Sequence, residues 1–222
     1  MNFLKKNIKN KANIFFAPTK VALIAMATIF TVTMSCSDDK TSGLDVPESE
    51  TLSQVEIDDL KFSREEEKLA RDVYLFSFDK YGVAIFNSIA QSEQQHMDMV
   101  LATLKVYNLE DPASADRGVF SNQTLQEFYN DLTAQSDLSL VEAYKVGALI
   151  EDLDINDLDQ LESRTTKTDL LNVYDRLECG SRNHMRSYNN LLVSSGVNYV
   201  PQYISLDKFT EIITSANEQC GR

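Results

Sequence analysis

The sequence predicts an all-α fold, a four-helix bundle with one long crossover between its second and third helices and a short C-terminal helix. Apolar residues recur every three or four positions in four long stretches, and no segment alternates as a strand would. The gap between the second and third stretches is far longer than the other two, which predicts antiparallel neighbours within each pair and one crossover between the pairs. The expected helices are residues 63–80, 84–107, 124–134 in the crossover, 140–153, 168–194 and 205–217.

Local signals mark the helix ends. Ser63–Glu66 and Ser139–Glu142 each match a capping box, in which a serine and a glutamate satisfy backbone donors at a helix start. Gly82 and Gly196 follow the first and fourth long helices, where glycine commonly ends a helix. Residues 154–168 are polar, so we expect a turn or a short helix there.

The first 36 residues resemble a removable export signal. Residues 1–20 contain five lysines and no acid, residues 21–34 are mostly apolar, and Cys36 follows. This order is typical of a secretory signal. The position of Cys36 resembles a bacterial lipoprotein processing site, which implies a lipid anchor at Cys36 in the outer membrane; the acidic residues that follow resemble signals for display on the cell surface. The alternative is a secreted protein with a free Cys36.

We assign residues 37–60 to a polar tether and residues 61–217 to one domain, with ordered structure beginning between Leu52 and Leu60. Removing residues 1–36 changes the net charge from −13 to about −18, which argues against a nucleic-acid partner. Cys179 and Cys220 remain, and they could pair in an oxidising compartment. The sequence leaves that pairing open.

The two histidines are the most informative residues for function, because both fall on predicted inward faces. His96 follows Glu93 by three residues on the same stripe of its helix. Carboxylates and imidazoles without a thiolate suit iron, manganese or zinc. The alternative is a buried Glu93–His96 pair joined by a hydrogen bond. The candidate ligands are Glu65–Glu67, Glu93, His96, Glu151, Asp154 and His184.

Four motifs resemble the bacterial and archaeal family called domain of unknown function 2202. They are EEKLARDVY (66–74), SEQQHM (92–97), VGALIE (146–151) and GSRNHMR (180–186). The first is also similar to the Glu-x-x-Ala-Arg-x-x-Tyr motif of rubrerythrin-type ferritin-like proteins. The resemblance implies a ferritin-like fold, and it selects Glu67 from the three neighbouring glutamates as a ligand.

The same resemblance implies a carboxylate/histidine centre, with iron as the expected metal, at one or two sites. We expect Glu67 and Glu151 to bridge two ions. One departure concerns Ser181, which stands where a second Glu-x-x-His motif would have its glutamate. The expected metal ligands are Glu67, Glu93, His96, Glu151 and His184, with Asp154 in reserve.

These observations lead us to expect an iron-binding protein of the cell envelope. One activity that such a protein could have is that of a di-iron oxidoreductase acting with oxygen or peroxide. A metal store without turnover, and a binding or scaffold protein with a degenerate site, are the alternatives. The electron donor, and the pairing of two bundles in a homodimer, are left open.

Overall fold

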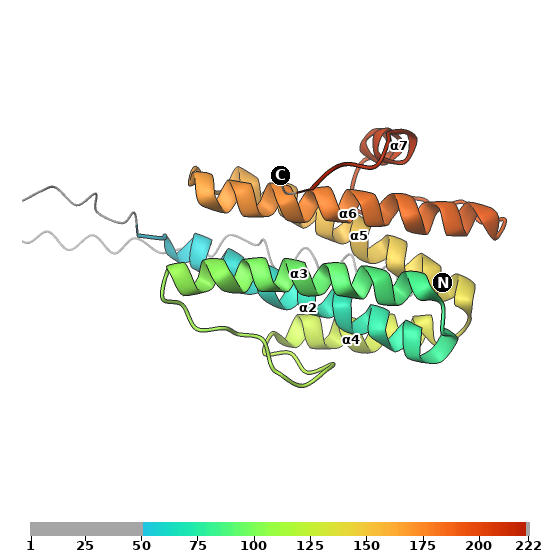
Figure 1. Cartoon of the computed structure of the whole chain (residues 1–222), viewed down its shortest axis with the longest axis horizontal. Coiled ribbons are helices and arrows are strands. Elements are labelled where there is room, and N and C mark those ends of the chain that lie inside the picture. Colours follow the sequence, from blue (N-terminus) through green and yellow to red (C-terminus); the bar gives the residue numbers. More distant parts are fainter. Residues whose placement is uncertain (1–50, 221–222) are drawn as a thin grey trace, which may run out of the picture. The chain divides into compact units, whose positions relative to one another are not determined.

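The computed structural model describes residues 51–220, and this part of the chain contains six helices and no strand. The four long helices are α2 (Gln54–Tyr81), α3 (Ala84–Val106), α5 (Leu140–Ser163) and α6 (Thr168–Ser194), and the two shorter ones are α4 (Gln123–Ser136) and α7 (Leu206–Thr214) (Figure 1). The predicted all-α bundle is confirmed.

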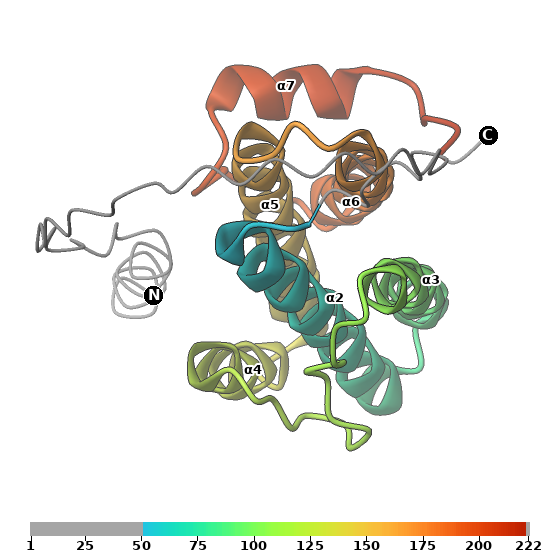
Figure 2. The same ribbon diagram turned by 90° about the vertical axis from the view of Figure 1, so that its left-hand side faces the viewer.

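The bundle consists of two antiparallel pairs, α2 with α3 and α5 with α6 (Figures 1 and 2). The crossover of residues 107–139 returns along the bundle, so that α3 and α5 run in the same direction. It contains α4, which packs against α2 and α5. α7 lies outside the bundle, where Lys208 forms ion pairs with Asp159 of α5 and Glu178 of α6.

The start of α2 differs from the prediction. The helix begins at Gln54, and Ser53 forms a complete capping box with Glu56. Ser63 therefore lies inside the helix, where it is buried and its hydroxyl has no hydrogen-bond partner. Residues 54–60, which we assigned to the tether, are the first turns of α2. The predicted stop is confirmed, because Gly82 adopts the left-handed conformation.

The end of α5 was also predicted wrongly. The helix continues to Ser163, because Ile155, Leu158 and Leu161 extend its buried face through the polar stretch. The acids between them are buried too, so their charge did not indicate a loop. Ser139 caps α5 as predicted, whereas Glu142 bonds to Gln135 and Lys145 rather than to the cap. α7 ends three residues earlier than expected.

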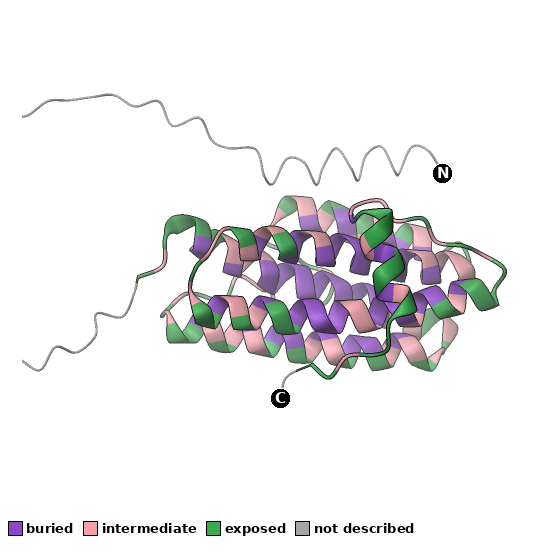
Figure 3. Ribbon diagram, turned by 90° about the horizontal axis from the view of Figure 1, so that it is seen from above, coloured by how far each residue is buried: buried purple, intermediate pink, exposed green. Residues whose placement is uncertain are grey.

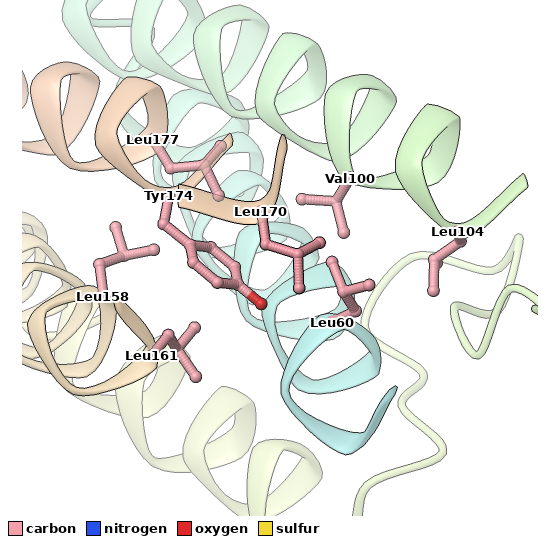
Figure 4. Close-up of a cluster of buried hydrophobic side chains, with 8 residues drawn as sticks. All are labelled: Leu60, Val100, Leu104, Leu158, Leu161, Leu170, Tyr174 and Leu177. Carbon is pink, nitrogen blue, oxygen red and sulfur yellow. The ribbon is translucent and has the colours of Figure 1, made fainter. Parts of the chain in front are cut away.

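Buried positions face inward along all four long helices (Figure 3). One end of the interior is a cluster of apolar side chains contributed by each long helix (Figure 4). Its fully buried members are Leu60, Val100, Leu104, Leu158, Leu161, Leu170, Tyr174 and Leu177. This cluster excludes water from the core on that side of the polar residues described below.

Charged side chains of α2 fasten the crossover to the bundle. Lys68 is fully buried and its Nζ lies 2.6 Å from Asp72 Oδ2, 2.9 Å from the Asp116 carbonyl oxygen and 4.3 Å from the centre of the Phe120 ring. Glu65 accepts hydrogen bonds from the backbone N–H groups of Ser121 and Asn122. Since a buried charge is tolerated only when it is paired, these contacts fix where the crossover lies.

The C-terminal segment is fastened in a similar way. Asp152 of α5 accepts hydrogen bonds from the backbone N–H groups of residues 202–204 and from the Tyr199 hydroxyl. Cys179 of α6 forms a disulfide with Cys220, which answers the question that the sequence left open. Arg182 and Arg186 of α6 both pair with Glu218.

The predicted signal, the lipidation site Cys36 and most of the tether lie outside the described residues. Among residues 51–220, no helix has both the length and the apolar character that a membrane crossing needs.

The two serines give a direct test of the helix start. Ser53→Ala should lower the free energy of unfolding by about 1 kcal/mol, because it removes the N-cap. Ser63→Ala should leave it unchanged or raise it, because alanine favours a helix and the substitution removes an unpartnered buried hydroxyl. Denaturant unfolding of both variants checks this. A larger loss of unfolding free energy for Ser63→Ala than for Ser53→Ala would show that Ser63 caps the helix, as the sequence predicted.

Candidate metal centre

The candidate ligands form one polar layer across the bundle, with apolar layers on both sides. Seven residues correspond to two helical turns, or about 10 Å along a helix. In α2, α3 and α5 a step of seven from the glutamate leads to an aromatic residue in one direction and to leucine or valine in the other, whereas in α6 the aromatic residue lies seven residues from Ser181 and the leucine seven residues from His184. These steps join Glu67 to Tyr74 and Leu60, Glu93 to Phe86 and Val100, Glu151 to Tyr144 and Leu158, Ser181 to Tyr188, and His184 to Leu177.

The first group of ligands comes from α2 and α3. His96 Nδ1 lies 3.1 Å from Glu67 Oε2 and 2.8 Å from Glu93 Oε2. All three side chains are buried, and their ligand atoms lie within 4.8 Å of one another, close enough to hold one ion.

The second group comes from α3, α5 and α6. His184 Nδ1 lies 2.9 Å from Glu93 Oε1 and 3.5 Å from Glu151 Oε2. These ligand atoms also lie within 4.8 Å of one another and are buried. The two imidazole rings are 5.7 Å apart between centroids.

Glu93 belongs to both groups and presents one oxygen to each histidine. We expected Glu67 and Glu151 to bridge, but each of these carboxylates contacts only one histidine. Glu93 is thus the carboxylate that both histidines share, and Glu67 and Glu151 each contact one histidine at the two outer ends of the layer. Helical spacing could place Glu93 beside His96, but not beside a histidine on another helix.

The layer is balanced electrostatically by its histidines. Burial opposes charge on Glu93, yet His184 and His96 hold the pKa of this carboxyl below its usual range. Burial also opposes charge on His184, but Glu93 and Glu151 raise the pKa of this imidazole to about 10. Burial raises the pKa of Glu67 to about 7, against the opposing influence of His96. Without a cation, protons on the imidazoles thus offset the carboxylate charges.

Two atoms of the second group are better placed to bind a cation than to form a hydrogen bond with each other. Glu93 Oε1 and His184 Nδ1 are buried and lie 2.9 Å apart, yet neither makes a hydrogen bond of acceptable geometry. Buried polar atoms are seldom left in this state, and a bound ion is one common reason. The donor set of carboxylate oxygens and imidazole nitrogens is suitable for iron, manganese or zinc.

Neighbouring side chains hold the ligands in place. The Tyr74 hydroxyl donates to Glu151 Oε1, and Ser92 Oγ lies 3.0 Å from His184 Nε2, on the far side of the ring from the carboxylates. Such contacts fix the orientation of a ligand and which nitrogen faces the metal. The sequence did not indicate Ser92, because its contact with His184 depends on how α3 and α6 pack together.

Asp154 lies beside the two groups rather than in them. Ser181 donates a hydrogen bond to Asp154 Oδ2, and burial together with the charges of Glu67 and Glu151 raises the pKa of Asp154 well above its usual range. Ser181 stands where a second Glu-x-x-His motif would have its glutamate. Its short side chain instead holds the additional carboxyl of Asp154 near the layer.

Other acids of α2 and α6 have different partners. Glu65 holds the crossover, and Glu66 is buried next to Asp157 and belongs to neither ligand group. Glu178, which precedes His184 by six residues, forms ion pairs with Arg182 and Lys208 on the outer side of α6. The selection of Glu67 from its neighbours agrees with this geometry.

Two glycines make room for rings in and beside the layer. A Cβ atom on Gly180 would lie 2.4 Å from His96 Nε2, and one on Gly147 would lie 2.4 Å from the Tyr188 ring. Any larger residue would push these rings away. The sequence contained this signal, because both glycines fall within the quoted motifs, but their function could not be inferred without knowing which rings they face.

Comparison with known proteins places this geometry in a family. The family model described as "Uncharacterized protein domain (DUF2202)" matches residues 56–216. The chain belongs to the DUF2202 family. The matched segment includes α2 to α7 almost completely, and it contains both ligand groups of this DUF2202 protein.

An archaeal relative has a similar sequence and fold. Uncharacterized protein MJ0754 of Methanocaldococcus jannaschii is 49% identical over 169 residues, which cover 76% of this chain and 91% of the relative. The structure titled "Crystal structure of hypothetical protein MJ0754 from Methanococcus jannaschii DSM 2661" matches with a TM-score of 0.76 and 47% identity, over 79% of this chain and 100% of that chain. The DUF2202 bundle therefore has an experimentally solved counterpart.

Gly180 offers a test of the packing in this DUF2202 protein. An alanine in place of a glycine within a helix normally stabilises the protein by about 1 kcal/mol. Gly180→Ala should instead lower the free energy of unfolding by about 1–3 kcal/mol, because its Cβ overpacks against His96. Gly147→Ala is the matched control, since its Cβ overpacks against the Tyr188 ring and not against the His96 imidazole. Denaturant unfolding and imidazole NMR signals check this, and a stabilised Gly180→Ala with unchanged His96 signals would contradict it.

Proposed function

We propose that this DUF2202 chain is a metal-binding protein with a dinuclear centre, in which Glu93 bridges two divalent ions. Glu67 and His96 complete one site, and Glu151 and His184 complete the other. The observation that carries the proposal is the single Glu93 carboxylate shared by two buried histidines from different helices. The alternative, a buried Glu93–His96 pair joined by a hydrogen bond, would not require a second histidine and two further carboxylates in the same layer.

Iron is the metal that we propose, with manganese and zinc as alternatives. Three carboxylates and two imidazoles, without a thiolate, form a hard and intermediate donor set. Each group offers three residues, which leaves coordination positions for an exogenous ligand. When bound, a pair of iron ions would supply redox chemistry with dioxygen or peroxide, which makes an oxidoreductase the activity that we propose to test.

The residues of the chain would do the remaining work. The Nδ1 atoms of His96 and His184 face the carboxylates, so binding of ions requires both imidazoles to lose a proton from that position. Ser92 would keep His184 in this orientation, and Tyr74 would hold Glu151. The apolar layers exclude water from the centre, which strengthens every charge interaction within it.

The decisive test is metal stoichiometry in the full chain after anaerobic loading with Fe²⁺. Wild type should bind two ions. Glu93→Gln should lose both, because glutamine keeps the shape but cannot bridge as an anion, whereas Glu67→Gln and Glu151→Gln should each lose one. Glu178→Gln is a matched control, since it removes a carboxylate from the outer side of α6 and should retain two ions.

Mass spectrometry of the metal and circular dichroism on the same samples would separate loss of metal from loss of fold. Wild type without metal, or Glu93→Gln with two ions, would refute the centre.

A second candidate function is metal storage or buffering without turnover. Asp154 supports it, because this buried carboxyl lies near the layer but is held by Ser181 outside both ligand groups. A further acidic group can help to accept ions without taking part in a reaction. Repeated consumption of peroxide by the iron-loaded chain with a reductant would favour the oxidoreductase, and a single stoichiometric reaction would favour storage.

We also propose that the protein is a lipoprotein of the cell envelope, anchored through Cys36. The basic and apolar N-terminal residues support this, as does the Cys179–Cys220 disulfide, since disulfides persist in oxidising compartments. The acidic net charge makes electrostatic attraction to anionic lipid a poor alternative for membrane attachment.

Fractionation of a Gram-negative host that expresses the full chain tests the anchor. Wild type should appear in the membrane fraction with a lipid-modified Cys36 detected by mass spectrometry. Cys36→Ser should move the protein out of that fraction, because it removes the lipidated thiol, while Cys220→Ser should not. Unmodified wild type in the soluble fraction would refute the anchor.

A further inference from the structure

Four neighbouring aromatic rings beside the candidate centre form a row from α2 to α5. Tyr74 and Tyr188 have ring centroids 5.5 Å apart, Tyr188 and Phe86 6.2 Å, and Phe86 and Tyr144 5.6 Å. Each of the four long helices contributes one of these rings. The row thus runs from α2 through α6 and α3 to α5, with successive ring centroids 5.5, 6.2 and 5.6 Å apart.

One end of this row contacts the candidate centre. The Tyr74 hydroxyl donates a hydrogen bond to Glu151 Oε1, and Glu151 belongs to the second ligand group. Tyr74 is 1% exposed, so no solvent molecule competes for its proton. Its phenol therefore has both an electron path toward the centre and a proton acceptor.

The other end leads toward the end of the bundle. Tyr144 lies little more than one turn after Leu140, where α5 begins, and its 7% exposure compares with 0% for Tyr188. Phe86 lies just after the start of α3 at Ala84, so these two rings belong to the same end of the bundle.

Tyr188 differs from the other two tyrosines. Its hydroxyl is buried and makes no hydrogen bond of acceptable geometry within the described part of the chain. Without an acceptor it cannot release its proton, and a charged ring in a dry core is costly. Tyr188 can therefore contribute its ring to the path without becoming a stable radical.

We propose that Tyr74, Tyr188, Phe86 and Tyr144 form a path for single electrons between the candidate centre and the end of the bundle, which lets a one-electron donor in solution reduce the centre without entering the core. This inference rests on the proposed function, because the centre oxidised by peroxide or dioxygen is the electron acceptor.

Tyr74 gives one electron to the oxidised centre and its phenolic proton to Glu151, which leaves a neutral tyrosyl radical. An electron from Tyr144 crosses the rings of Phe86 and Tyr188 to restore Tyr74, whose proton returns from Glu151. Tyr144 releases its proton to water, and the donor then supplies an electron while water returns the proton. The net transfer is one electron from the donor to the centre.

The test uses the full chain loaded with Fe²⁺, oxidised with hydrogen peroxide, and followed by electron paramagnetic resonance while ferrocyanide is added as the donor. Wild type should show a tyrosyl signal that ferrocyanide removes. Tyr74→Phe should lose the signal. Tyr188→Leu and Tyr144→Phe should keep the signal but slow its removal, since the path is broken beyond Tyr74.

Two variants act as controls. Tyr188→Phe keeps the ring and should retain the wild-type rate of removal. Tyr174→Leu removes a buried tyrosine of the same helix from the apolar cluster, so it matches Tyr188→Leu in volume and should also retain that rate.

Iron content measured on every sample separates the two ways to fail. Bound iron with no tyrosyl signal, or with equal removal rates in wild type and Tyr188→Leu, would overturn the electron path alone. Absence of bound iron in wild type would overturn the proposed function and the path together.

Discussion

The shared carboxylate of Glu93, held between two buried imidazoles, is the interaction on which the rest of the structure depends. Removing carboxylates and imidazoles from water costs several kcal/mol per charge unless each is compensated. His96 and His184 supply that compensation from different helices, and Glu93 links them. The layer draws its residues from α2, α3, α5 and α6, so each of these charges has its partners only when all four helices are in place.

The layered interior explains how such a centre can be kept dry. On one side Leu60, Val100, Leu158 and Leu177 form an aliphatic layer, and on the other side the layer is aromatic. In α2, α3 and α5 both layers lie seven residues from the ligand glutamate, so one periodicity sets the core and the centre in these helices. The two sides differ chemically, however. Saturated side chains only exclude water, whereas the row of aromatic rings that begins next to Glu151 is also the electron path that we propose.

Periodicity predicted the helices well because most of them bury one continuous stripe. α3 and α6 were located within a residue, and both histidines were expected on inward faces. Prediction failed where polar residues are buried. Ser63 resembled a cap, and the acids after Leu153 resembled a loop, because sequence cannot show that their partners lie on other helices. The contact of Glu93 with His184 was missed for the same reason, since it depends on the register between α3 and α6.

Charge counting explains why Ser181 need not weaken a dinuclear centre. Two divalent cations bring four positive charges, and the two ligand groups contain three carboxylates and two imidazoles that are neutral when they bind metal. One negative charge is still missing, and Asp154 is the buried acid beside the layer that can supply it. A glutamate at position 181 would occupy the space that this carboxyl now uses. Ser181 instead donates a hydrogen bond to Asp154, which keeps the fourth charge within reach while the ligand positions stay open.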